Sequence, residues 1–150
     1  MYIHPLTAIP FLLTICALSN SAFAETACSQ KEPNATIEEC ECLKKTPGAT
    51  VEACELELQD KKTENTDRLL NSTYRKLTSQ LDKDRKAKLV AAQRLWNQFR
   101  VKDCEFSLST LDGGSPIRRN IFYAGCVEDQ LRIRNKQLQE ICKDMDIKCE

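Results

Sequence analysis

The sequence predicts an all-α protein, a small antiparallel helical bundle stapled by disulfide bonds, with three long helices and a short N-terminal one. Three observations indicate this fold class. Apolar residues recur at steps of three and four through most of the chain, which is the spacing of one helix face. No segment alternates convincingly between apolar and polar residues, as a strand would. The 150 residues include nine cysteines, a density typical of exported domains that supplement a modest core with cross-links.

Residues 1–24 have the layout of a cleavable signal peptide. An apolar run over residues 9–18 precedes a polar break and the small-x-small pattern Ala22-Phe23-Ala24. The run is shorter than the roughly 20 apolar residues that a membrane-spanning helix needs, so we expect cleavage and no stable membrane anchor. Residues 25–150 would then form one domain, periplasmic or secreted.

Cleavage after Ala24 would change the chemistry of the chain. It would remove His4, the only histidine, and Cys16, the odd ninth cysteine. Histidine is the commonest general base and metal ligand, and the eight remaining cysteines can all pair in an oxidising compartment. A zinc site at Cys40 and Cys42 is the weaker alternative, because a lone C-x-C pair lacks further ligands. We therefore expect a binding protein without catalytic residues, cofactor or metal.

Two other function classes fit the sequence poorly. Nucleic acid binding rests on a basic field, whereas 22 basic residues here balance 22 acidic ones, so we expect no nucleic acid partner. A glycan hydrolase needs two carboxyls at least about 5 Å apart in one site. The candidates are Asp103 with Glu105 and Glu128 with Asp129, but adjacent and alternate residues on a helix point in different directions.

The first two helices are expected over residues 36–45 and residues 51–81. Thr50 follows the Pro47-Gly48 turn and is a plausible N-cap of the longer helix. At 1.5 Å per residue, that helix is about 45 Å long and can form the spine of the fold. Its expected inner face carries Val51, Cys54, Leu58, Thr66, Leu69, Leu70, Thr73, Tyr74, Leu77 and Leu81.

The other two helices are expected over residues 85–106 and from residue 116 to about residue 143. Asp82 or Asp84 can cap the first of them, and Ser115-Pro116 is a typical start for the second. The first should pack through Leu89, Ala92, Trp96, Phe99 and Phe106. The second should bury Ile117, Ile121, Ala124, Leu131, Leu138 and either Ile141 or Cys142.

Two disulfides follow from antiparallel packing of consecutive helices. Cys42 and Cys54 lie at similar distances on either side of the turn between the first two helices. Cys104 and Cys126 lie on either side of the glycine-containing connection between the last two. Folding each pair of helices back on itself brings the two cysteines of each pair together.

Cys40 needs a partner elsewhere, because it lies about 200° from Cys42 around a helix. Its partner is Cys28, Cys142 or Cys149, and the pairing of these four cysteines stays open, since sequence alone does not settle connectivity.

Two motifs in the second and third predicted helices match one protein family in order and spacing. Their residues are Asp67, Leu70, Asn71, Tyr74 and Leu77, followed by Ala92, Gln93, Arg94, Trp96, Phe99, Arg100 and Cys104. Further matching positions are Gly114, Ser115, Cys126, Arg134 and Leu138. With this pattern the chain resembles the lysozyme inhibitor LprI-like family from about residue 42 to residue 138. The resemblance implies a periplasmic protein whose partner is a lysozyme.

The motif side chains have a structural and a functional interpretation. We favour the structural one for Asp67, Asn71, Tyr74, Gln93, Arg94, Trp96 and Arg100. In it, Arg94 can pair with a carboxylate on the neighbouring helix, for instance Asp67, and Trp96 packs with Phe99 in the core because aromatic side chains bury large areas. In the alternative, the polar motif residues frame a groove for a ligand.

The connection over residues 107–119 is the expected contact surface for a lysozyme. It is long, contains glycines and is tethered on both sides by an expected disulfide. A lysozyme cleft contains two catalytic carboxyls. Arg118 or Arg119 would supply a cation for those carboxyls, and Asp112 and Ser115 would donate or accept hydrogen bonds in the cleft. The alternative is a solvent loop that only joins two helices.

Three functions remain, in order of preference. The first is an exported protein that binds a lysozyme and inhibits it by steric occlusion of its cleft. The second is a periplasmic structural or interaction module of the cell envelope without inhibitory activity, and the third is a glycan hydrolase. The sequence leaves the oligomeric state open.

Overall fold

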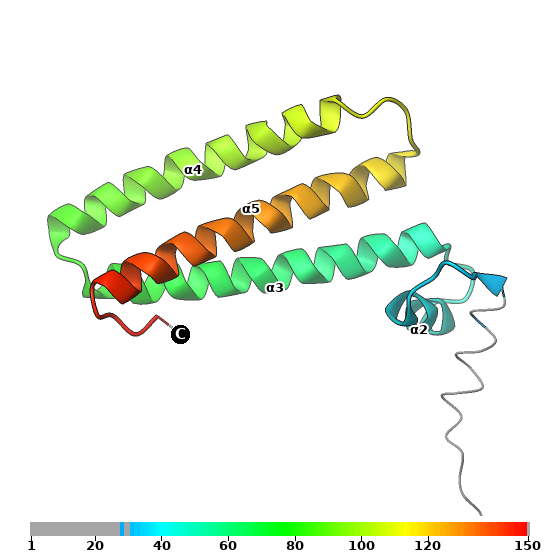
Figure 1. Cartoon of the computed structure of the whole chain (residues 1–150), viewed down its shortest axis with the longest axis horizontal. Helices are drawn as coiled ribbons and strands as arrows, with labels where there is room; N and C mark the ends of the chain where they lie inside the picture. The colour runs from blue at the N-terminus through cyan, green and yellow to red at the C-terminus, as the bar shows by residue number, and fades with distance from the viewer. Residues whose placement is uncertain (1–27, 29–30, 150) are drawn as a thin grey trace, which may run out of the picture.

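The computed structural model describes residue 28 and residues 31–149, and these form four helices (Figure 1). They are α2 (Ile37–Lys45), α3 (Val51–Gln80), α4 (Lys83–Ser109) and α5 (Pro116–Asp144). No strand occurs in the described part of the chain, so the predicted all-α class and the count of one short and three long helices are confirmed. The expected signal peptide, with His4 and Cys16, lies outside the described residues. Among those residues, no helix is apolar over a length that would cross a membrane.

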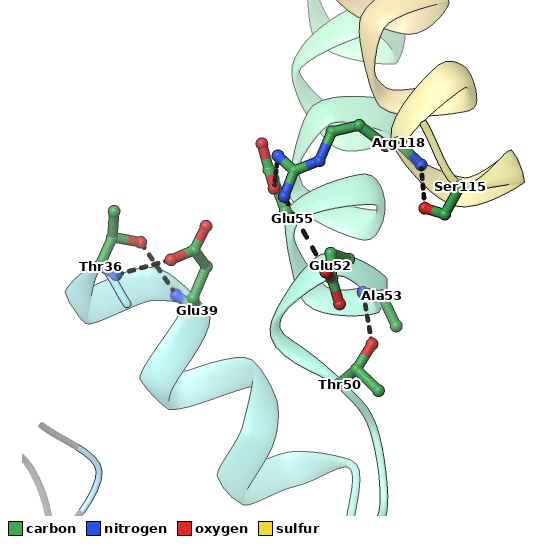
Figure 2. A network of polar contacts seen from close by, with 8 residues as sticks. All are labelled: Thr36, Glu39, Thr50, Glu52, Ala53, Glu55, Ser115 and Arg118. Atoms are coloured by element: carbon green, nitrogen blue, oxygen red, sulfur yellow. Dashed lines mark hydrogen bonds and ion pairs between the residues drawn. The ribbon is translucent and has the colours of Figure 1, made fainter. Parts of the chain in front are cut away.

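Side-chain caps define where the helices begin. Thr36 and Glu39 form a reciprocal capping box at α2 (Figure 2), which satisfies two backbone N–H groups that have no partner within the helix. The hydroxyl of Thr50 accepts from the backbone N–H of Ala53 at α3. At α4 the cap is Asp82, one of the two candidates.

The three long helices lie side by side with α5 between α3 and α4 (Figure 1). The chain runs along α3, back along α4, and forward again along α5, so α3 and α5 are parallel. Helices that follow one another are antiparallel, as predicted, but the most extensive interface joins the parallel pair. Contacts between α4 and α5 are fewer, and α3 and α4 hardly touch.

The seam between α3 and α5 has the heptad spacing of a coiled coil. Leu70 and Leu77 of α3, one heptad apart, and Leu131 and Leu138 of α5, also one heptad apart, belong to one buried cluster. Leu70 and Leu131, and likewise Leu77 and Leu138, are 61 residues apart in the sequence. The hydroxyl of Thr63 donates to the backbone oxygen of Ala124, which is also 61 residues further along. Residues at steps of three and four therefore interlock in register along both helices. The core of the protein lies in this seam.

Helix α4 buries fewer of the residues on its predicted inner face than expected. Leu89 and Trp96 pack against the core and are partly buried. Phe99 and Phe106, predicted to be inside, are 56% and 68% exposed, and Ala92 is exposed as well. The reason is that α4 has one substantial neighbour, α5, which covers only a narrow strip of its surface.

The α3 and α5 predictions need two smaller corrections. Leu69 was expected on the inner face of α3 and is 60% exposed, because it lies one position away from the strip that faces α5. At the end of α5, either Ile141 or Cys142 was expected to be buried. Cys142 is the buried one, and Ile141 is exposed.

The α3–α5 seam predicts a large stability difference between two leucines of one helix. Replacing Leu77 by alanine should lower the free energy of unfolding by about 2–5 kcal/mol, because the side chain is fully buried and leaves a cavity. Replacing Leu69 by alanine should change it by less than about 0.5 kcal/mol, since the side chain is already in water. Urea unfolding followed by circular dichroism measures both, and equal losses would contradict the described seam.

Candidate functional site

All eight cysteines that follow the expected cleavage point are paired. The two expected bonds, Cys42–Cys54 and Cys104–Cys126, are present in the structure. Cys28 pairs with Cys40, and Cys142 pairs with Cys149. The first of these two bonds ties the N-terminal segment to α2, and the second folds the C-terminal segment back onto the end of α5.

The connection between α4 and α5 is shorter than predicted. Helix α4 continues to Ser109, and α5 begins at Pro116, so residues 110–115 form the loop instead of residues 107–119. Gly113 and Gly114 have φ angles of 83° and 92°, a region that residues with a Cβ rarely adopt. The loop joins the end of α4 to the start of α5 in Figure 1, and the Cys104–Cys126 bond links the same two helices.

The structure places the four expected contact residues in different situations. The hydroxyl of Ser115 accepts from the backbone N–H of Arg118 at 3.2 Å and so caps α5. The guanidinium of Arg118 donates to Glu55 of α3 at 3.0 Å and lies 4.0 Å from Glu52 (Figure 2). Arg118 is therefore already paired with carboxylates of its own chain.

Asp112 and Arg119 are the expected contact residues that remain free for a partner. Asp112 is exposed at the tip of the loop, and Arg119 is half-buried in the first turn of α5. Neither side chain makes an ion pair with another described residue. They supply one negative and one positive group at the same end of the molecule.

A shallow hollow lies between α4 and α5 and also reaches Gln59 of α3. Its lining includes Asp103 of α4 and Phe122, Asp129 and Ile133 of α5. Asp103 accepts a hydrogen bond from Gln130 at 2.8 Å, which links the two helices within the hollow.

Exposed apolar side chains lie in this hollow and elsewhere on the same two helices: Phe122 and Ile133 line the hollow, and three more belong to α4. Phe99 precedes Asp103 by four residues and Phe106 follows it by three, so both lie on the same side of α4 as Asp103. Leu95 extends this row by one more turn. We call the following set the α4–α5 apolar face: Leu95, Phe99, Phe106, Phe122 and Ile133, with exposed fractions between 40% and 68%. Sequence reasoning assigned Phe99 and Phe106 to the core, because periodicity shows which residues share a face but not whether a neighbour covers it.

The polar motif residues form a different cluster from the predicted one. Asn71 donates to Asp67 at 2.7 Å within α3, and the expected ion pair between Asp67 and Arg94 is absent among the described residues. The prediction was wrong because α3 and α4 are separated by α5. Instead, Gln93 of α4 accepts from Arg134 of α5 at 3.0 Å.

Trp96 lies at the centre of this cluster. The guanidinium carbons of Arg100 and Arg134 lie 5.2 Å and 5.8 Å from the centroid of its ring, within the range of cation–π attraction. Tyr74, the remaining motif residue, is half-buried and packs against the core. The motif thus joins α4 to α5 through stacked and hydrogen-bonded side chains.

The carboxylates considered for hydrolysis each contact another side chain. Glu105 pairs with Lys102, while Glu128 accepts from Thr66 of α3 and Asp129 pairs with Arg132. Among the described residues, no group of three or more His, Cys, Asp or Glu side chains could hold a metal ion.

A family model described as lysozyme inhibitor LprI matches residues 28–138. No curated protein and no solved structure matches the chain.

The Cys104–Cys126 bond is expected to hold α4 in place. Cys104 is the one buried residue of α4, so replacing both cysteines by serine should raise amide hydrogen exchange in α4 while the α3–α5 seam stays protected. A matched control replaces Cys28 and Cys40 by serine and should leave exchange in α4 unchanged. Mass spectrometry of deuterated peptides measures both variants, and unaltered exchange in α4 of the first would contradict this role.

Proposed function

We propose that this chain, which belongs to the lysozyme inhibitor LprI family over residues 28–138, is an exported protein that binds a lysozyme and inhibits it by covering the substrate cleft. The family membership is the observation that carries this proposal. Inhibition by occlusion needs a rigid surface that fits the cleft, and no chemical step by the inhibitor.

Export is supported by the cross-links and by the first residues of the chain. Four disulfides join the cysteines between Cys28 and Cys149, and such bonds persist in oxidising compartments. The signal-peptide pattern of residues 1–24 agrees with the same location.

The α4–α5 end of the molecule is the proposed contact surface. Its loop joins α4 to α5 (Figure 1) and presents the exposed Asp112, with Arg119 in the first turn of α5. A lysozyme cleft contains two carboxyl groups, for which an arginine is a suitable partner. Arg118 remains paired with Glu55 in this arrangement and keeps the start of α5 against α3.

The apolar face next to the loop would supply most of the binding energy. Aromatic residues are enriched in the cores of protein interfaces and among the residues whose truncation costs most affinity. Phe106 and Phe122 are exposed and belong to the two helices that the loop connects. A partner that covers the loop therefore also reaches these rings.

A turbidity assay of bacterial cell walls tests the proposed function. The purified oxidised protein should slow lysis by added lysozyme and should cause no lysis alone. Lysis by the protein alone would indicate a hydrolase, and no effect on lysozyme would favour an envelope module without inhibitory activity. Either of these outcomes would contradict the proposal.

The loop assignment has its own test. Replacing Asp112 and Arg119 together by alanine should raise the inhibition constant tenfold or more if they lie at the centre of the contact. Arg85→Ala is the control, since Arg85 also lies near the start of a helix but at the opposite end of α4. An unchanged inhibition constant in the double variant would remove the loop from the contact surface without affecting the family function.

The apolar face is tested in the same assay. Phe106→Ala should weaken inhibition about tenfold or more, because a buried interface aromatic commonly contributes that much. Leu69→Ala removes a side chain of similar exposure from α3 and should have no effect. Equal inhibition by the two variants would show that the partner does not cover this face.

A further inference from the structure

Two arginines, Arg100 and Arg134, lie over the ring of the same tryptophan. Arg85, Arg118 and Arg132 each pair with an acidic side chain. Arg100 and Arg134 make no ion pair with any described residue, although both lie over the ring of Trp96. Two positive charges are thus gathered at one aromatic side chain without a negative charge among their described contacts.

The hydrogen bonds of these guanidinium groups are also incomplete. Arg134 donates through Nε to Gln93 at 3.0 Å and through Nη1 to Gln137 at 3.1 Å, so its acceptors are neutral amides. The Nε atom of Arg100 is buried and has no acceptor. A buried donor without a partner destabilises the fold, and burial also lowers the pKa of Arg134.

A carboxylate would supply the negative charge that this cluster lacks. It is planar, carries the opposite charge and accepts two parallel hydrogen bonds from a guanidinium. We propose that Arg100 and Arg134, positioned on Trp96, form a binding site for a carboxylate group. Gln93 and Gln137 hold Arg134 in orientation, while Trp96 holds both guanidinium groups over its ring and limits their freedom before the ligand arrives.

The site is separate from the loop in the sequence and in the fold. Arg134 follows Ser115 by 19 residues of continuous helix, which corresponds to about 28 Å. Two residues of the α4–α5 apolar face, Leu95 and Phe99, immediately precede Trp96 and Arg100. Two sources of the carboxylate are possible. An acidic side chain of a docked protein would come with further contacts to the adjoining apolar face, whereas a small organic acid would contact the arginines alone.

Trp96 provides a direct probe, because it is the only tryptophan of the chain. Its fluorescence is followed in the full, oxidised protein during titration with glutarate, a small dicarboxylate, and with a capped peptide of six glutamates. Sodium chloride keeps the ionic strength constant, and a capped peptide of six glutamines is the uncharged control. We expect a saturable change with at least one of the two carboxylate probes and none with the glutamine peptide.

The variants assign the response to the two arginines. Arg100→Gln and Arg134→Gln should each weaken binding at least tenfold. Arg94→Gln, which removes an exposed charge from the same helix, should leave it unchanged. If Arg134→Gln disturbs folding, as seen by circular dichroism, Arg134→Lys takes its place, because it keeps the charge but loses the fork of donors.

The outcomes separate the two sources and can overturn the proposal. Tighter binding of the glutamate peptide than of glutarate, compared per carboxylate, identifies an acidic protein segment as the ligand, and equal or weaker binding identifies a small acid. No saturable change with either probe, or a change that survives in Arg100→Gln and in the Arg134 variant, would overturn the site. Because this titration contains no lysozyme, its failure and a failure of inhibition are distinguishable.

Discussion

The parallel seam between α3 and α5 is the interaction on which the rest of the structure depends. Leu70 and Leu77 pack in register with Leu131 and Leu138, and apolar burial of this kind is the main favourable term in folding. The two helices that form the seam are separated in the chain by the whole of α4. Helix α4 therefore serves as the return connection that allows two parallel helices to meet, and its own packing is secondary.

This secondary position explains why α4 carries the candidate binding surface. With α5 as its one substantial neighbour, α4 keeps Phe99 and Phe106 exposed, although exposed apolar groups of this size are unfavourable in water. The Cys104–Cys126 bond compensates for the narrow contact by linking α4 covalently to α5. An inhibitor that occludes an enzyme cleft needs a rigid surface that no other part of its own chain covers, since ordering a mobile surface would cost affinity.

The motif residues that identify the family also show how far sequence reasoning extends into the site. The choice of Asp67 as the partner of Arg94 assumed that consecutive long helices pack against each other. In the structure α5 lies between them, so the amide of Gln93 meets Arg134, and Arg100 stacks on Trp96. Arg134 was a motif position without an assigned role, because nothing in its own segment indicates that it crosses to α4.

The sequence by itself determined the features that depend on contacts within a few residues. The bounds of α2, α3 and α5 to within one residue, the caps at Thr50 and Ser115, and the disulfides across the two turns follow from local spacing, because their partners lie close along the chain or on consecutive helices. Only the tertiary structure decided that Cys40 pairs with Cys28, that Arg118 is taken up by Glu55, and that Phe106 faces water. The last two outcomes depend on which helices become neighbours, and that choice follows from the α3–α5 seam, which joins residues 61 positions apart.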